Sequence, residues 1–139
     1  MSNMTRQESM TISWTAGVQM AVEVRGHRLI VDQPKEDGGD DQGITPVEMF
    51  VASLGACIGY FAVRFCQRRN LPTAGLAVKV AWDYAEQPHR VGSLTVQVSL
   101  PPGFPAEMQE RLQKVVEGCT IHQSLTHSPP IAIALKETG

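Results

Sequence analysis

Residues 45–63, Thr45-Pro46-Val47-Glu48 followed by MFVASLGACIGYFAV, are the stretch that decides the fold. Threonine is a favoured N-cap, proline is tolerated at the first helical position, and a glutamate at the third position after the cap completes a capping box. The pattern ends at Asn70-Leu71-Pro72. We therefore predict a long helix from about Pro46 to about Arg69.

This predicted helix is strongly apolar. No charged residue occurs from Met49 to Val63, and Arg64 closes the run. A membrane-spanning helix needs roughly 20 apolar residues, so this shorter run indicates a helix enclosed on most sides by protein rather than by lipid. Small residues on neighbouring turns would let another backbone approach closely: Ala52, Gly55, Ala56 and Gly59.

Alternation of apolar and polar residues predicts β-strands on both sides of the helix. Before it, residues 11–15 are a candidate strand and residues 18–33 a hairpin that turns at Gly26. After it, residues 76–85 and 94–100 are candidate partner strands. Between the first hairpin and the helix, the acidic, glycine-rich segment 34–43 is interpreted as a solvated, mobile connection rather than a cation site, since it fits no calcium-loop pattern.

The last third of the chain adds smaller elements. An amphipathic helix is predicted over residues 105–118, with Met108, Leu112, Val115 and Val116 facing inward and Gly118 as its C-terminal cap. A turn or short helix follows over residues 119–128. Ile131, Ile133 and Leu135 alternate as in a final strand. The element order predicts an α+β fold with helices packed on mostly antiparallel sheet.

Composition narrows the possible functions. The chain has 139 residues with a formal net charge of −2, which fits a single domain over residues 1–139 and gives no basic excess for nucleic acid. No secretory signal is visible in the polar N-terminal stretch, so a cytoplasmic location is expected. An odd number of cysteines (three) points to free, catalytic or metal-binding thiols rather than a disulfide scaffold.

The cysteines differ in their surroundings. Taken alone, Cys57 on a buried helix is most often a small apolar filler. Cys66 follows it by nine residues, about 180° around an α-helix, and is therefore interpreted as structural. Cys119 follows Gly118 and, if Thr120 opens a short helix, lies at its positive end, where a thiolate is favoured.

Two cysteines of these kinds fit the chemistry of a peroxide-reducing thiol pair. One thiolate attacks the O–O bond, and a second thiol condenses with the resulting sulfenic acid to give a disulfide. Cys57 would be the attacking thiol in a dry, apolar environment, and Cys119 the resolving thiol. Whether the two sulfur atoms meet cannot be derived from their spacing.

The segments around both cysteines resemble the OsmC/Ohr superfamily. Thr45-Pro46-Val47-Glu48-Met49 through Ala52-Ser53-Leu54-Gly55-Ala56-Cys57 is similar to its central-helix signature, and Gly118-Cys119-Thr120-Ile121-His122 to its second-cysteine segment. The resemblance implies antiparallel sheets around a long central helix plus a second helix, in an intertwined homodimer. It also implies thiol-dependent reduction of organic hydroperoxides at the subunit interface in oxidative-stress defence, with no cofactor. The reductant would be a dithiol, either a dihydrolipoyl protein or a small thiol.

Two family positions differ in this chain, which indicates a divergent branch. The family places a glutamate directly after the proline, where this sequence has Val47, and Glu48 comes one residue later. Glu48 is therefore a candidate for two roles, a helix cap or a catalytic group, and helical geometry puts it on the face opposite Cys57. The family's thiolate-stabilising arginine has no clear counterpart, with Arg25 and Arg28 as the nearest substitutes.

Two other functions remain open at this stage. Cys119, His122 and His127 are residue types that bind zinc. Zinc sites usually have four ligands with recognisable spacing, and the other Cys and His residues form no second pair of ligands, so no metal is predicted. The two histidines are instead interpreted as a polar pair that lines the pocket and tunes Cys119. The alternative to an enzyme is a non-catalytic dimer of the same fold that binds a small apolar ligand at the subunit interface.

Overall fold

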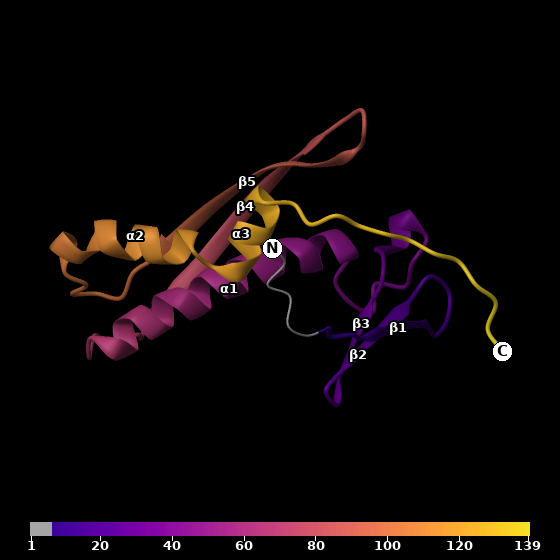
Figure 1. The fold of residues 1–139 in the computed structure, drawn as a ribbon, viewed down its shortest axis with the longest axis horizontal. Helices are drawn as coiled ribbons and strands as arrows, with labels where there is room; N and C mark the ends of the chain where they lie inside the picture. The colour runs from indigo at the N-terminus through magenta and orange to yellow at the C-terminus, as the bar shows by residue number, and fades with distance from the viewer. Residues whose placement is uncertain (1–6) are drawn as a thin grey trace. The chain divides into compact units, whose positions relative to one another are not determined.

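The computed structural model describes residues 7–139, so residues 1–6 of the N-terminal stretch used to assess a secretory signal lie outside it. The chain divides into two compact units, one up to Phe50 and one from Val51 to Gly139. The prediction of a single domain over residues 1–139 stays a prediction. Figure 1 traces the elements along the chain.

The first unit is built on a three-stranded antiparallel sheet in the order β1-β2-β3. Its strands are β1 (Thr11–Trp14), β2 (Met20–Val24) and β3 (His27–Val31), which confirms the predicted first strand and hairpin. Arg25 and Gly26 turn the hairpin with φ of 50° and 81°. Two positive φ values match the right-handed twist of the flanking strands, and glycine adopts such a value without a Cβ clash.

The acidic segment 34–43 is largely exposed and folds around one buried carboxylate. Asp32 is 1% exposed, and its carboxylate accepts backbone N–H groups from Gln33 (2.8 Å), Asp40 (3.2 Å) and Gln42 (3.0 Å). Burial disfavours the charged carboxylate, but the three N–H donors outweigh it and lower the pKa of Asp32. The short 3-10 turn η1 (Lys35–Asp37) lies in the same segment.

Helix α1 (Pro46–Arg68) begins in the first unit and continues through the second, as the sequence predicts. The capping box is present, because the Thr45 hydroxyl accepts the Glu48 N–H at 3.1 Å and the Glu48 carboxylate accepts the Thr45 N–H at 2.9 Å. By length and composition α1 could also cross a membrane, a test that the core helices of soluble proteins pass as well.

The second unit contains a hairpin and two further helices. Strands β4 (Ala77–Ala85) and β5 (Arg90–Ser99) form a two-stranded antiparallel sheet. The 3-10 turn η2 (Ala106–Met108) leads into α2 (Gln109–Glu117), and α3 (Thr120–Thr126) follows, so the predicted turn or short helix is a helix. The core is formed by buried residues of α1 and α2 together with Cys119: Leu54, Ile58, Ala62, Phe65, Leu112 and Val116.

Helix α1 is buried along only one face within this single chain. Its buried residues include Leu54, Ile58, Ala62, Phe65 and Cys66, whereas Ala52, Ala56 and Tyr60 recur at every fourth position on an exposed face. Tyr60 is 61% exposed. The expectation that protein encloses the helix on most sides is therefore not met by the chain alone.

The predicted final strand is absent among the described residues. Residues 128–139 are assigned neither helix nor strand, and Ile131, Ile133 and Leu135 are 82%, 85% and 95% exposed. A β-strand forms only when a neighbouring strand accepts its N–H and C=O groups. The alternating sequence has the strand pattern, but this segment is paired with none of the strands that the structure describes.

The small residues of α1 allow the β4–β5 hairpin to approach. A Cβ on Gly55 would lie 3.0 Å from the Val80 Cγ2, and one on Gly59 would lie 3.4 Å from the Val78 Cγ2. The partner in this close approach is thus a strand of the same unit, and its valine side chains are the nearest atoms.

Replacing Gly55 with a large side chain should therefore destabilise the second unit. We expect Gly55→Leu to lower the free energy of unfolding by about 1–3 kcal/mol, because a branched side chain cannot fit against Val80 without backbone movement. Gly59→Ala is the matched control, because its Cβ needs little space and alanine favours a helix by about 1 kcal/mol over glycine. Urea denaturation measures both variants. Equal stability of Gly55→Leu and the wild type would contradict this packing.

Candidate active site

The candidate site lies where α1 meets the start of α3. Cys57 is in the middle of α1 and is partly buried against the core cluster that contains Cys119. Cys119 is fully buried, at 0% exposure, between α2 and α3. The Cys57 side chain is close enough to Cys119 to raise the pKa of the Cys119 thiol, and both residues are free thiols. The structure therefore brings together the two cysteines that the sequence singles out.

Cys119 is the N-cap residue of α3. Its backbone is extended (φ −63°, ψ 148°), and its sulfur accepts the backbone N–H of His122 at 3.3 Å. This is the position predicted from the sequence, at the first turn of a short helix. A sulfur atom replaces the oxygen that usually satisfies these N–H groups.

The charge state of Cys119 differs from the sequence expectation. Burial raises the pKa of the Cys119 thiol, the His122 N–H lowers it, and the nearby Cys57 sulfur raises it again, so that the net direction is upward. Burial therefore outweighs the favourable helix end. Cys119 is therefore held as a thiol rather than as a thiolate.

Cys66 lies apart from this pair. It is completely buried near the C-terminal end of α1, and burial raises the pKa of its thiol despite the positive charge of nearby Arg69. The Arg69 guanidinium stacks 3.7 Å from the Phe65 ring centroid and donates to the Phe65 carbonyl. The position agrees with the structural role predicted for Cys66.

The other candidate residues have local partners. The Glu48 carboxylate takes part in the capping box, so the capping role is observed and the catalytic role stays a prediction. Arg28 lies 3.9 Å from Glu23 in an exposed ion pair across the first sheet, and Arg25 forms the hairpin turn.

The histidines near Cys119 are held by carbonyl groups. Nδ1 of His122 lies 2.6 Å from the Glu117 carbonyl, and Nδ1 of His127 lies 3.2 Å from the Gln123 carbonyl. Among residues 7–139, no group of three His, Cys, Asp or Glu side chains is arranged to hold a metal ion.

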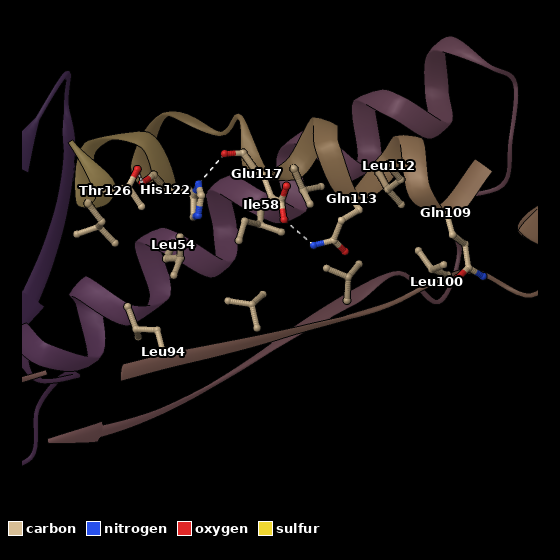
Figure 2. Close-up of a pocket in the computed structure, with 14 residues that line it drawn as sticks. Leu54, Ile58, Leu94, Leu100, Gln109, Leu112, Gln113, Glu117, His122 and Thr126 are labelled. Carbon is tan, nitrogen blue, oxygen red and sulfur yellow. Dashed lines mark hydrogen bonds between the residues drawn. The ribbon is translucent and has the colours of Figure 1, made fainter. Parts of the chain in front are cut away.

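A cavity of about 470 Å³ opens beside this cluster, within the second unit. Figure 2 shows its walls, which come from α1, β5, α2 and α3. Most of them are aliphatic, and polar side chains occur on the α2 and α3 side. The lining residues are Leu54, Ile58, Leu94, Val96, Val98, Leu100, Gln109, Leu112, Gln113, Val116, Glu117, His122, Leu125 and Thr126.

Sequence reasoning placed His122 and His127 together in the pocket, and the structure separates them. His122 lines the cavity and contacts Cys119 through its backbone, whereas His127 is absent from the cavity lining and lies in a shallow depression with Gly118 and Thr120. The helical spacing of α3 accounts for the difference, because positions five residues apart point in different directions.

Comparison with known proteins identifies the family. The sequence profile described as OsmC-like protein matches residues 38–134, which is more than half of the chain. The chain belongs to the OsmC-like protein family. No curated protein matches the sequence.

Solved structures of OsmC-like proteins share this fold. An OsmC-like protein from Mycoplasma pneumoniae has a TM-score of 0.74 at 17% identity, over 90% of this chain and 91% of that one. A Vibrio cholerae protein named for organic hydroperoxide resistance, with captopril bound in one of its active sites, has a TM-score of 0.66 at 16% identity, over 91% and 90%. The organic hydroperoxide resistance protein OsmC from Legionella pneumophila has a TM-score of 0.58 at 17% identity, over 87% and 91%. These similarities confirm the predicted α+β, OsmC-like fold.

Proposed function

We propose that this OsmC-like protein is a thiol peroxidase that reduces organic hydroperoxides, with Cys57 as the attacking thiol and Cys119 as the resolving thiol. The proximity of the two side chains in one cluster carries the proposal, since the second step requires the sulfur atoms to meet. Family relatives named for hydroperoxide resistance support the substrate class.

Burial and charge assign the two roles. A hydroperoxide can reach Cys57, which is partly exposed, but not Cys119, which is fully buried. The raised pKa of Cys119 leaves it protonated, so its S–H can stabilise negative charge on the Cys57 sulfur. The thiolate is the nucleophile in this chemistry. Cys57 is therefore the sulfur suited to attack.

The proposed reaction has two steps. The Cys57 thiolate attacks the terminal oxygen of the hydroperoxide, which gives Cys57 sulfenic acid and an alkoxide that takes up a proton to become the alcohol. The Cys119 thiol then attacks the sulfenic sulfur, which releases water and forms the Cys57–Cys119 disulfide. A dithiol, either a dihydrolipoyl protein or a small thiol, reduces the disulfide by thiol–disulfide exchange and restores both thiols.

Steady-state turnover tests the proposal. The reduced protein should consume cumene hydroperoxide continuously when dihydrolipoamide is present, with one alcohol formed for each dithiol oxidised. Free cysteine at the same thiol concentration serves as a control for uncatalysed thiol oxidation. Consumption of hydroperoxide no faster than in that control would favour the second candidate function, a non-catalytic binding protein. Two observations fit that candidate: the cavity of about 470 Å³, and the Glu48 carboxylate that is used in the helix cap.

The proposed active form is a homodimer. Two apolar features are exposed among residues 7–139: the face of α1 with Tyr60, and the extended segment with Ile131, Ile133 and Leu135. Apolar surface of this extent marks interaction sites, and an alternating segment can add to the sheet edge of a second copy.

The dimer proposal predicts a position-specific effect in the C-terminal segment. Ile133→Asp should shift the protein from dimer to monomer, because a charge would lie on the apolar face of the added strand. Ala132→Asp is the matched control, since it adds the same charge one residue away on the opposite face of a strand. Sedimentation velocity measures both. A monomeric wild type, or equal dissociation of the two variants, would contradict the proposal.

A further inference from the structure

We propose that the cavity between β5, α2 and α3 binds a neutral medium-chain amphiphile, whose single O–H group donates a hydrogen bond to Nε2 of His122. The site is separate from the thiols, since no cysteine lines it. The inference rests on the proposed function in one respect only: organic hydroperoxides and the alcohols formed from them are amphiphiles of this class.

The tautomer of His122 follows from its contacts. Nδ1 lies 2.6 Å from the Glu117 carbonyl oxygen, which can only accept a hydrogen bond, so Nδ1 carries the proton. In the neutral ring Nε2 then has a lone pair and no hydrogen. Figure 2 shows this second nitrogen pointing away from Glu117 and toward the space beside Leu54 and Leu94. A hydrogen-bond acceptor therefore faces an apolar cavity.

The cavity walls define the rest of the ligand. Strand β5 contributes alternate aliphatic side chains, among them Leu94, Val96 and Val98, and α1 contributes Leu54 and Ile58. A volume of about 470 Å³ lies within the usual range for small-molecule sites, and such sites combine apolar walls with a few polar groups that fix orientation. A hydrocarbon chain with one polar end fits this combination.

The charge at the cavity favours a neutral ligand over an anion. Glu117 is the one carboxylate among the lining residues, and Gln113 donates to it at 2.8 Å. A ligand carboxylate would face both this negative charge and the lone pair of Nε2. An alcohol or hydroperoxide has the proton that Nε2 requires and carries no charge.

His122 also links the cavity to the thiol pair. Its backbone N–H donates to the Cys119 sulfur while its ring lines the cavity. Leu54, Ile58 and Val116 are shared between the cavity wall and the core cluster that holds Cys119. A ligand bound here would thus contact the same residues that pack against the reacting cysteines.

Binding of n-octanol to the reduced full-length protein, measured by isothermal titration calorimetry, tests the inference without any oxidant. We expect saturable binding, and binding of octanoate that is weaker by about tenfold or more. His122→Phe keeps a ring in place and removes the acceptor, which should weaken octanol binding about tenfold, the usual effect of one lost hydrogen bond. His127→Phe, at the histidine outside the cavity, is the matched control and should bind as the wild type does.

A cavity-filling variant tests the same site independently, in case the His122→Phe variant does not fold. Val96→Phe places bulk inside the cavity and leaves the contacts of His122 with Glu117 and Cys119 in place, so it should abolish octanol binding with the melting temperature largely retained. In the wild type, nitrogen-15 NMR of the imidazole should show the Nδ1–H form, with the Nε2 signal shifting when octanol is added.

Several results would overturn the inference: no saturable binding, octanoate binding as tightly as octanol, equal binding by the wild type and His122→Phe, or unchanged binding by Val96→Phe. If the wild type does not bind octanol and the Val96→Phe variant no longer forms a dimer, a second copy of the chain fills the cavity instead of a ligand. The outcomes are distinct from those of the peroxidase test. Octanol binding without peroxide consumption would refute the proposed function and support this inference. Peroxide consumption without octanol binding would refute this inference and support the proposed function.

Discussion

Cys57→Ser should reduce consumption of cumene hydroperoxide to the background rate, a loss of about three orders of magnitude or more, because a serine hydroxyl is not deprotonated at neutral pH and attacks peroxides poorly. The fold should be retained. Serine is close to cysteine in volume, and the partly exposed position at Cys57 limits the change in the free energy of unfolding to about 1 kcal/mol.

Cys66→Ser provides the matched control for this experiment. Cys66 is on the same helix but outside the thiol pair, so its replacement should leave the rate per folded molecule unchanged, even though a buried hydroxyl lowers stability. Circular dichroism supplies the folded fraction. Substantial turnover by Cys57→Ser, or loss of turnover specific to Cys66→Ser, would show that the attacking thiol is assigned wrongly.

Cys119→Ser should uncouple the two steps of the reaction. The first oxidation should proceed, but the Cys57 sulfenic acid would have no thiol to condense with and would be oxidised further to sulfinic acid. Mass spectrometry should then detect two added oxygen atoms on the peptide that contains Cys57 after excess hydroperoxide. Steady-state turnover with dihydrolipoamide should fall sharply.

The serine substitution separates the chemical role of Cys119 from its structural role. A serine oxygen is a favoured N-cap and can accept the His122 N–H that the cysteine sulfur accepts now. Cys119→Ala removes both roles and should cost about 1 kcal/mol more in stability. If Cys119→Ser turns over hydroperoxide with a dithiol at the wild-type rate, Cys119 is not the resolving thiol.

Much of the fold could be predicted because its signals are local. The capping box, the proline at the first helical position and the terminating Asn70-Leu71-Pro72 place α1 within one residue of its observed end. The hairpins follow from alternation and from turn residues, and α2 from its apolar stripe. Each of these signals depends on neighbouring residues and requires no knowledge of what packs against them.

The expectations that differed from the structure depend on partners distant in sequence. Small residues at Gly55 and Gly59 indicated a close approach, but the sequence could not show that β4 is what approaches. The alternation at Ile131, Ile133 and Leu135 indicated a strand, yet a strand also needs an edge to pair with. The turn of segment 34–43 around Asp32 could not be predicted, because the N–H donors to Asp32 are backbone groups, which leave no signature in the side chains.

The sequence singled out the two cysteines that the fold brings together, but not the electrostatics around them. Helix ends favour thiolates, and Cys119 is at such an end, but its complete burial has the larger effect on the pKa. Burial is a property of the packed structure rather than of the local sequence. The orientation of the His122 ring toward the cavity is likewise a property of the packed structure, because it depends on the contact between Nδ1 and the Glu117 carbonyl.

Disulfide mapping after a single oxidation event tests the pairing of the two thiols most directly. Reduced protein is mixed with one equivalent of cumene hydroperoxide, quenched after seconds with an alkylating agent, digested, and analysed by mass spectrometry. We predict a Cys57–Cys119 disulfide, with Cys66 alkylated as a free thiol. Three alkylated cysteines, or a disulfide that involves Cys66, would contradict the proposed mechanism.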